Sequence, residues 1–233
     1  MMRNVNRGNA VFGGLLVVAG LVFAQRLTAA TRGPVSLPVP ARDELVVNAK
    51  TETAVFAGGC FWGIQSVFQH IKGVVSATSG FAGGTVDKPS YEDVSSGMTG
   101  HAESVRVVFD PSQVTYGQLL RVFFSVAHDP TQLNRQGPDT GPQYRSAIFY
   151  MSDEQQKTAE AYIDQLNKSH AFSKPIVTQV APLKAFYIAE AYHQNYAELH
   201  PNDLYIRIND APKVANLKKE FPELYSQKLA AHE

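Results

Sequence analysis

The stretch AVFAGGCFWG, residues 54–63, joins a short apolar run to two glycines and to Cys60, the only cysteine among 233 residues. The apolar run predicts a strand, which the glycines end before a segment whose pattern predicts an amphipathic helix. Cys60 would then lie at or just before the helix N-terminus, where unpaired backbone N–H groups and the helix dipole favour a thiolate. This position indicates a reactive cysteine. The alternative is a small buried hydrophobic residue, the usual role of a free cysteine.

The helix expected after Cys60 has one apolar stripe, because residues advance by about 100° each around a helix. The stripe comprises Phe61, Ile64, Val67, Phe68 and Ile71. Trp62 falls nearly opposite this stripe, and a tryptophan side chain is costly to leave in water. Trp62 is therefore expected to line a pocket for an apolar group; the alternative is that another loop covers it.

The composition argues against several classes of function. Formal net charge is zero and the sequence pI is about 7.1, with no basic patch, so a nucleic-acid partner is not expected. A single cysteine cannot form an intramolecular disulfide, so any disulfide would be made with another molecule. The seven histidines lack metal-binding spacing, and no metal site is expected.

The N-terminal region is distinct from the rest of the chain. Arg3 and Arg7 precede an apolar and glycine run over residues 10–24, which is short for a membrane span of about 20 residues but suits a signal peptide. Small residues around Ala24 and Ala30 offer cleavage sites. Residues 1–30 are therefore expected to be a signal peptide, or else an uncleaved membrane anchor, of a periplasmic or extracellular protein. The proline-containing residues 31–50 are expected to be a linker, and residues 51–233 one domain.

Strand and helix patterns alternate from residue 53 onward. Strands are expected over residues 54–57, 74–81, 104–109, 144–151 and 176–180. Besides the helix after Cys60, Thr115-x-x-Gln118 resembles a capping box that opens one helix, and Ser152-x-x-Gln155 opens another. The tail over residues 189–229 mixes helical pieces with the breakers Pro201, Pro212 and Pro222. The pattern predicts a mixed α/β (α+β) domain rather than a doubly wound fold.

Glu103 is a candidate acid. It leads into the strand at 104–109, and period-two alternation places it on the same face as Val105, Val107 and Phe109. An apolar environment raises the pKa of a carboxyl, and a carboxyl that is protonated near neutral pH can serve as a general acid. The alternative is that Glu103 lies at a frayed strand start, in water.

Several further motifs point to one family. They are GCFWG at 59–63, GHAE at 100–103, DPT at 129–131, GPD at 137–139, QYRS at 143–146 and FYIAEAYHQ at 186–194. In order and approximate spacing, this set resembles the A-type peptide methionine sulfoxide reductases over roughly residues 53–225. The resemblance implies that residues 51–233 are a catalytic domain that reduces methionine-S-sulfoxide, free or in proteins, and so repairs proteins under oxidative stress.

The resemblance also implies a fold and a set of roles. The fold would be a two-layer sandwich with a central mixed sheet, flanking helices, a ferredoxin-like core and a long coil-rich C-terminal tail. Cys60 would attack the sulfoxide sulfur, and Glu103 would protonate the sulfoxide oxygen. Of the other implied residues, Tyr91 and Tyr144 would bind that oxygen, Phe61 and Trp62 would hold the S-methyl group, and Asp139 would help to hold the site.

The chain departs from many of these relatives because its tail, residues 199–233, has no second, resolving cysteine. The sulfenic acid left on Cys60 would therefore need an external thiol, from a thioredoxin-like or glutaredoxin-like protein or a small molecule. No bound cofactor is implied, and a monomer is expected.

Two other functions explain part of the pattern. A thiol hydrolase or acyltransferase would pair Cys60 with His101 or His193, but would leave Trp62 and Glu103 unexplained. An exported binding module would use Trp62 and the tyrosines to grip a peptide.

Overall fold

The computed structural model describes residues 33–43 and 50–232, all within one compact unit that spans residues 31–233. The expected signal peptide or anchor, residues 1–30, lies outside the described residues. Among the helices that are described, none has both the length and the apolar character needed to cross a membrane.

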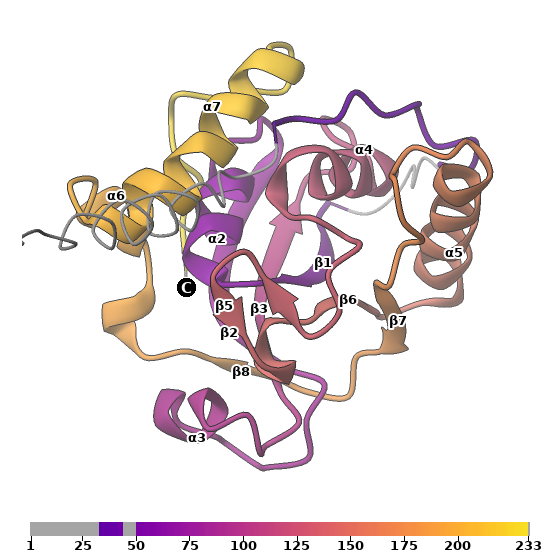
Figure 1. The fold of residues 1–233 in the computed structure, drawn as a ribbon. Coiled ribbons are helices and arrows are strands. Elements are labelled where there is room, and N and C mark those ends of the chain that lie inside the picture. Colours follow the sequence, from indigo (N-terminus) through magenta and orange to yellow (C-terminus); the bar gives the residue numbers. More distant parts are fainter. Residues whose placement is uncertain (1–32, 44–49, 233) are drawn as a thin grey trace, which may run out of the picture. The chain divides into compact units, whose positions relative to one another are not determined.

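A mixed sheet of six strands forms the centre of this unit (Figure 1), in the order β7-β6-β1-β3-β2-β8. The strands are β1 (Glu52–Gly58), β2 (Val74–Ala82), β3 (Ala102–Phe109), β6 (Ser146–Tyr150), β7 (Gln179–Pro182) and β8 (Phe186–Ile188). Neighbours are antiparallel except for the parallel pair β6–β7. A separate two-stranded ribbon pairs β4 (Arg135–Gln136) with β5 (Asp139–Thr140).

Helices pack against this sheet and one another. The longer ones are α2 (Phe61–Gln69), α4 (Tyr116–Val122), α5 (Asp153–Lys168) and α7 (Ala211–Glu220), and the short ones are α3 (Tyr91–Ser95) and α6 (Tyr196–Leu199). α2 contacts β2, β3 and α7, whereas α5 contacts β6, β7 and α4. The segment β1-α2-β2-β3-α4-β6, with spatial order β6-β1-β3-β2, is a ferredoxin-like core. The expected fold class is confirmed.

Aromatic packing fixes α2 on the sheet. The ring of Phe56 in β1 stacks at 5.0 Å on Phe68 of α2 and at 5.0 Å on Phe123. Phe123 begins η1 (Phe123–Ala127), the π-helical continuation of α4. Each such ring pair contributes roughly 0.5–1.5 kcal/mol beyond the burial of its area. The five residues of the expected apolar stripe are all buried, although Ile71 lies beyond the end of α2.

Local signals predicted where two of the helices begin. Thr115 forms the expected capping box with Gln118, and Ser152 caps α5 by accepting a hydrogen bond from the Gln155 N–H. Two strand predictions were displaced: the strand expected at 176–180 lies at 179–182, and the one expected from 144 begins at Ser146. Tyr144 instead ends a 3-10 helix, η2 (Pro142–Tyr144).

The prediction of a long coil-rich tail is not confirmed. Besides α6 and α7, the tail contains a 3-10 helix, η3 (Ala191–His193), and a π-helix, η4 (Ile206–Asp210), that runs directly into α7. Pro212 was expected to break a helix, but it stands in the first turn of α7. A proline is well tolerated there, because the N–H that it lacks would have no partner in the helix.

Part of the segment expected to be a linker is docked on the domain. Leu37 is only 2% exposed and belongs to the main core. The backbone around it is bound by side chains of the domain, because Tyr162 donates to the Pro38 carbonyl at 2.8 Å and Arg121 to the Leu37 carbonyl at 2.8 Å. The Asp43 carboxylate accepts the Gly117 N–H at 2.9 Å. Residues 33–43 therefore form an arm over α4 and α5, and not a free linker.

We expect Leu37→Ala to lower the free energy of unfolding by about 2–5 kcal/mol, because it removes a buried side chain and leaves a cavity. Val39→Ala is the matched control: Val39 lies on the same arm but is 63% exposed, so its loss should change stability by less than about 0.5 kcal/mol. Urea unfolding measures both. Equal effects of the two substitutions would contradict the docked arm.

Candidate active site

A glycine turn places Cys60 at the start of α2. Gly59 has a φ of +96°, a conformation that glycine adopts without strain. A Cβ on Gly59 would also lie 2.5 Å from the Cβ of Gln136. The chain therefore leaves β1 through a turn that only glycine fits, and Cys60 becomes the N-cap residue of α2, as the sequence predicted.

The Cys60 thiol is buried, and its pKa is raised well above the usual value, contrary to the expectation of a thiolate. Burial is the largest cause, followed by the negative charges of Glu103 and Asp210. The backbone N–H of Trp62 and the positive charge of Lys213 act the other way and lower the pKa. The helix N-terminus does favour the anion, but the loss of solvation outweighs it. The resting thiol is protonated.

Glu103 lies beside the sulfur-bearing turn. It is the second residue of β3 and only 2% exposed, so the interpretation of a solvated carboxyl at a frayed strand end was wrong. Its Oε2 accepts the backbone N–H of Phe61 at 3.0 Å. Phe61 is the first residue of α2, and its N–H is one of the groups that a helix leaves without an internal partner.

The pKa of Glu103 is raised from 4.5 to about 8. Burial is the main cause, the hydrogen bond from Phe61 lowers the value, and the charges of Asp139 and Asp210 raise it further. The carboxyl is therefore mostly protonated at pH 7, as the sequence predicted from its apolar face. Because it is mostly neutral, its repulsion of a Cys60 anion is weak at that pH.

Tyr91 and Tyr144 lie within electrostatic range of this acid. Tyr91 is the first residue of α3, where Ser90 and Asp93 form a capping box. Burial, followed by the charge of Glu103, raises the pKa of both tyrosines. Both phenols therefore stay protonated near neutral pH and can donate hydrogen bonds.

Phe61 and Trp62 form part of an aromatic wall. Phe61 is buried, with its ring centroid 6.4 Å from that of Tyr91 and 6.5 Å from that of Trp62. Trp62 is half-buried: its ring stacks on Tyr196 at 3.8 Å, and its Nε1–H donates to Nδ1 of His193 at 3.2 Å. The tail thus covers one face of the indole, as the alternative interpretation of Trp62 expected.

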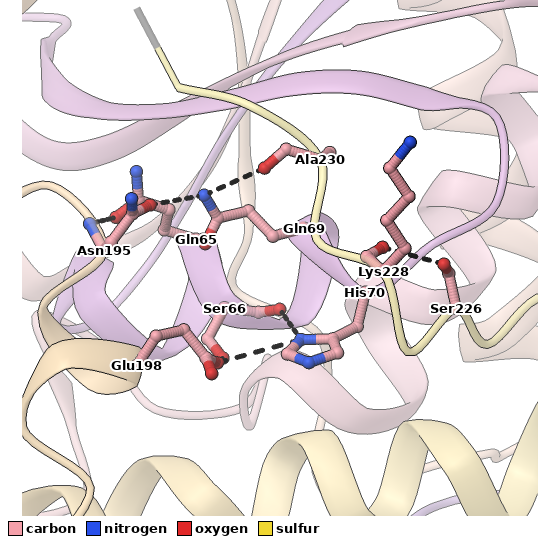
Figure 2. Close-up of polar contacts among 9 residues, drawn as sticks. All are labelled: Gln65, Ser66, Gln69, His70, Asn195, Glu198, Ser226, Lys228 and Ala230. Atoms are coloured by element: carbon pink, nitrogen blue, oxygen red, sulfur yellow. Dashed lines mark hydrogen bonds and ion pairs between the residues drawn. The ribbon is translucent and has the colours of Figure 1, made fainter.

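Polar contacts hold the tail segment against α2 (Figure 2). Gln69 donates to Oδ1 of Asn195 at 2.6 Å, and Ser66 donates to Glu198 at 2.8 Å. The last residues join the same face, because Nε2 of Gln69 donates to the Ala230 carbonyl at 3.4 Å. The Ala230 N–H in turn donates to the Gln69 carbonyl at 2.9 Å. These contacts bracket Tyr196 in sequence, and so fix the ring that packs on Trp62.

Asp139 leads to residues that the sequence analysis missed. It is half-buried in β5 and accepts a hydrogen bond from the hydroxyl of Tyr205, which precedes η4. Burial raises the pKa of Asp139, while the Tyr205 hydrogen bond and the Lys213 charge lower it. Tyr205, Asp210 and Lys213 escaped prediction because nothing local distinguishes them in a tail that was read as interrupted by prolines.

The two histidines considered as partners of the thiol make other hydrogen bonds. His101 accepts the Gly84 N–H at its Nδ1 and so donates from Nε2 to the Val86 carbonyl, and His193 accepts from Trp62. The Cys–His pairing of a thiol hydrolase has no support in these contacts. The residues that the structure describes contain no cluster of three or more His, Cys, Asp or Glu suited to a metal ion.

Comparisons with known proteins agree on one family. The family model described as peptide methionine sulfoxide reductase matches residues 52–225. Peptide methionine sulfoxide reductase MsrA 2 of Mesorhizobium japonicum is 61% identical over 178 residues, which cover 76% of this chain and 91% of that protein.

Two solved structures are also similar. Mxr1 from Saccharomyces cerevisiae in reduced form has a TM-score of 0.61 and 34% identity, covering 70% of this chain and 92% of that one. Methionine sulfoxide reductase A of Corynebacterium diphtheriae has a TM-score of 0.58 and 35% identity, covering 75% and 90%.

The raised pKa of Glu103 predicts a pH-dependent stability. Between about pH 4.5 and 8, the folded protein holds a proton on Glu103 that the unfolded chain releases. This group therefore makes the wild type less stable as pH rises through that window, with a limiting slope of about 1.4 kcal/mol per pH unit. Glu103→Gln removes the loss, so the variant should gain stability relative to wild type between pH 5 and pH 7 in urea unfolding.

The control is Glu160→Gln on the exposed side of α5, whose stability should follow the wild-type pH profile. Parallel profiles for Glu103→Gln and wild type would show that Glu103 is ionised in the folded protein.

Proposed function

The chain belongs to the peptide methionine sulfoxide reductase family, in its A-type (MsrA) branch, and we propose that Cys60 and Glu103 carry out its reaction. As a member of this family it is an oxidoreductase that reduces methionine sulfoxide. The observation that carries the assignment is the hydrogen bond from Phe61 N–H to Glu103. It joins a buried, mostly protonated carboxyl to the residue next to the only cysteine.

The two groups suit the two needs of the reaction. A sulfoxide oxygen is a poor leaving group until it is protonated, and Glu103, with a pKa of about 8, has a proton to give at neutral pH. The Cys60 sulfur then attacks the substrate sulfur, and an S–S bond forms as the S–O bond of the protonated sulfoxide breaks. The released hydroxide bonds to the Cys60 sulfur and the S–S bond breaks, giving methionine and a sulfenic acid. The Cys60 sulfur is oxidised by two electrons and the substrate sulfur is reduced by two.

The proton balance of this step closes within the site. Cys60 starts as a thiol, so its proton must leave as the sulfur attacks. Glu103 has just given up a proton to the sulfoxide oxygen, and the thiol proton replaces it. The sum is a thiol and a sulfoxide converted to a sulfenic acid and a thioether.

The surrounding residues supply substrate binding. Tyr91 and Tyr144 donate hydrogen bonds to the sulfoxide oxygen, and Phe61 and Trp62 contact the S-methyl group. When the sulfoxide oxygen and the S-methyl group are both held, only one of the two sulfoxide epimers directs its sulfur toward Cys60. The epimer proposed is S. Asp139, itself bound by Tyr205, holds this side of the site. The proposed substrates are methionine-S-sulfoxide as the free amino acid and within oxidised proteins, so the role is protein repair.

Recycling requires a thiol from outside the chain. With no second cysteine in the sequence, the sulfenic acid cannot close an internal disulfide. A first external thiol condenses with it to a mixed disulfide and releases water. A second thiolate then attacks the external sulfur and frees Cys60, leaving the reductant as a disulfide. The proposed donor is a thioredoxin-like or glutaredoxin-like protein, or a small thiol.

We expect Glu103→Gln to slow single-turnover reduction of methionine-S-sulfoxide by roughly 10²–10⁴-fold, because the amide keeps the shape but has no proton to transfer. Methionine release, with dithiothreitol as donor, measures the rate. Cys60→Ala sets the zero of the assay, and Glu160→Gln should match wild type. Wild-type rates in Glu103→Gln would remove Glu103 as the acid, and turnover by Cys60→Ala would overturn the mechanism.

The proposed location of the enzyme is outside the cytoplasm, with residues 1–30 as the export signal. The docked arm begins at residue 33, so cleavage after Ala24 or Ala30 would leave it intact. The intact mass of the protein from cells is expected to correspond to one of these two N-termini. The full mass of 25.5 kDa would instead identify an uncleaved anchor or an unexported protein, and fractionation of membranes would separate the two.

A further inference from the structure

A buried ion pair lies at the junction of η4 and α7. Asp210 is the last residue of η4, and its Oδ1 lies 3.0 Å from Nζ of Lys213 in α7. The two side chains are 0% and 11% exposed. π-Helical turns such as η4 occur frequently at functional sites.

Steric fit places this pair on the first turn of α2. A Cβ on Gly63 would overlap Oδ1 of Asp210 and would lie 2.8 Å from Nζ of Lys213. Gly63 is three residues after Cys60, and residues three apart share a helix face. The pair therefore lies over the same face of the turn that presents the sulfur, and glycine at 63 permits this approach.

The pair is poorly arranged for stability alone. Oδ2 of Asp210 is buried and has no hydrogen-bond partner among the described residues. A buried ion pair often stabilises a fold no better than apolar side chains of the same volume, and an unsatisfied acceptor makes it worse. Burying these charges against α2 is therefore better explained by their effect on a neighbouring group.

We propose that Asp210 and Lys213 are a positioning pair, in which Asp210 holds the Lys213 ammonium at the start of α2 so that its charge stabilises an anion on the Cys60 sulfur. Carboxyl groups from two elements raise the pKa of the thiol, Asp210 from η4 and, where it is ionised, Glu103 from β3; Lys213 and the Trp62 N–H lower it. Burial favours the neutral thiol, so the opposing positive charge matters most when the sulfur becomes anionic.

This inference rests on the proposed function, in which the sulfur carries negative charge twice. It does so when the thiol loses its proton to attack the sulfoxide, and again when an external thiolate displaces it from the mixed disulfide. Lys213 lowers the energy of both anions without touching the substrate. Asp210 moderates the effect, since its own charge disfavours the same anion.

The two charges have opposite signs, which gives a test that a structural role cannot imitate. Because the chain has a single cysteine, the rate of alkylation by iodoacetamide at pH 7 reports on Cys60 alone, and it rises with the thiolate fraction of that sulfur. We expect Lys213→Gln to slow alkylation of the full chain by roughly three- to tenfold, tenfold corresponding to one pKa unit. Asp210→Asn keeps an oxygen that can accept the hydrogen bond from Lys213 but removes the opposing negative charge, so it should accelerate alkylation by a similar factor.

Lys213→Arg, which keeps the charge, should stay close to wild type. Lys219→Gln, on an exposed residue of the same helix, is the matched control and should leave the rate unchanged. Shifts of both single variants in one direction, or no shift in either, would overturn the proposal. If only one of the two single variants folds, the direction in which its alkylation rate changes supports or overturns the proposal. If neither folds, the pair is structural and the proposal fails.

Single-turnover measurements separate this inference from the proposed function. With methionine-S-sulfoxide, Lys213→Gln should lower the rate of sulfenic acid formation by about the factor seen in alkylation, with the substrate concentration for half-maximal rate unchanged. If wild-type protein alkylates as expected but reduces no sulfoxide, the proposed function fails while the pair's effect on the thiol stands.

Discussion

The hydrogen bond between the Phe61 N–H and Glu103 is the constraint on which the site depends. It ties the first turn of α2 to β3 and fixes the acid beside the sulfur-bearing residue. A single N–H donor is too little to keep a deeply buried carboxyl ionised, so the bond positions Glu103 while burial keeps it protonated. One arrangement of strand and helix thus sets both the place and the protonation state of the proposed acid.

That arrangement holds only if the N-terminus of α2 stays in place. The sheet fixes one side of the helix through the stacked rings of Phe56 and Phe68. The tail fixes another, through contacts such as that between Trp62 and His193, which are 131 residues apart in sequence. The first turn of α2 is also closely packed, because a Cβ on Gly59 would clash with Gln136 and a Cβ on Gly63 would clash with Asp210. The site is therefore a property of the whole domain rather than of the GCFWG motif alone.

Sequence periodicity predicted the parts of the site that are local. The glycine break placed Cys60 at a helix start, and strand alternation placed Glu103 in the apolar layer. The prediction that Cys60 is a thiolate was wrong. A helix N-terminus is a local signal, whereas burial, which keeps the thiol protonated, depends on the tertiary structure. Lys213 was missed for the same reason, since Cys60, the residue on which it is proposed to act, is distant in sequence. Docking of the arm could not be predicted, because a single buried leucine among prolines gives no periodic pattern of apolar residues.

The resting site holds two acids, the Cys60 thiol and the Glu103 carboxyl, that are both mainly neutral near pH 7. A sulfoxide carries no net charge, so it can enter without separating buried ions. In the proposed step one acid gives its proton before the other loses its own, and charge separates only briefly, inside a medium where separation is costly. A protonated thiol also resists indiscriminate oxidation, because the thiolate is the reactive form. In the proposed mechanism, raised pKa values on both groups therefore couple activation of the sulfur to the arrival of an oxygen that Glu103 can protonate.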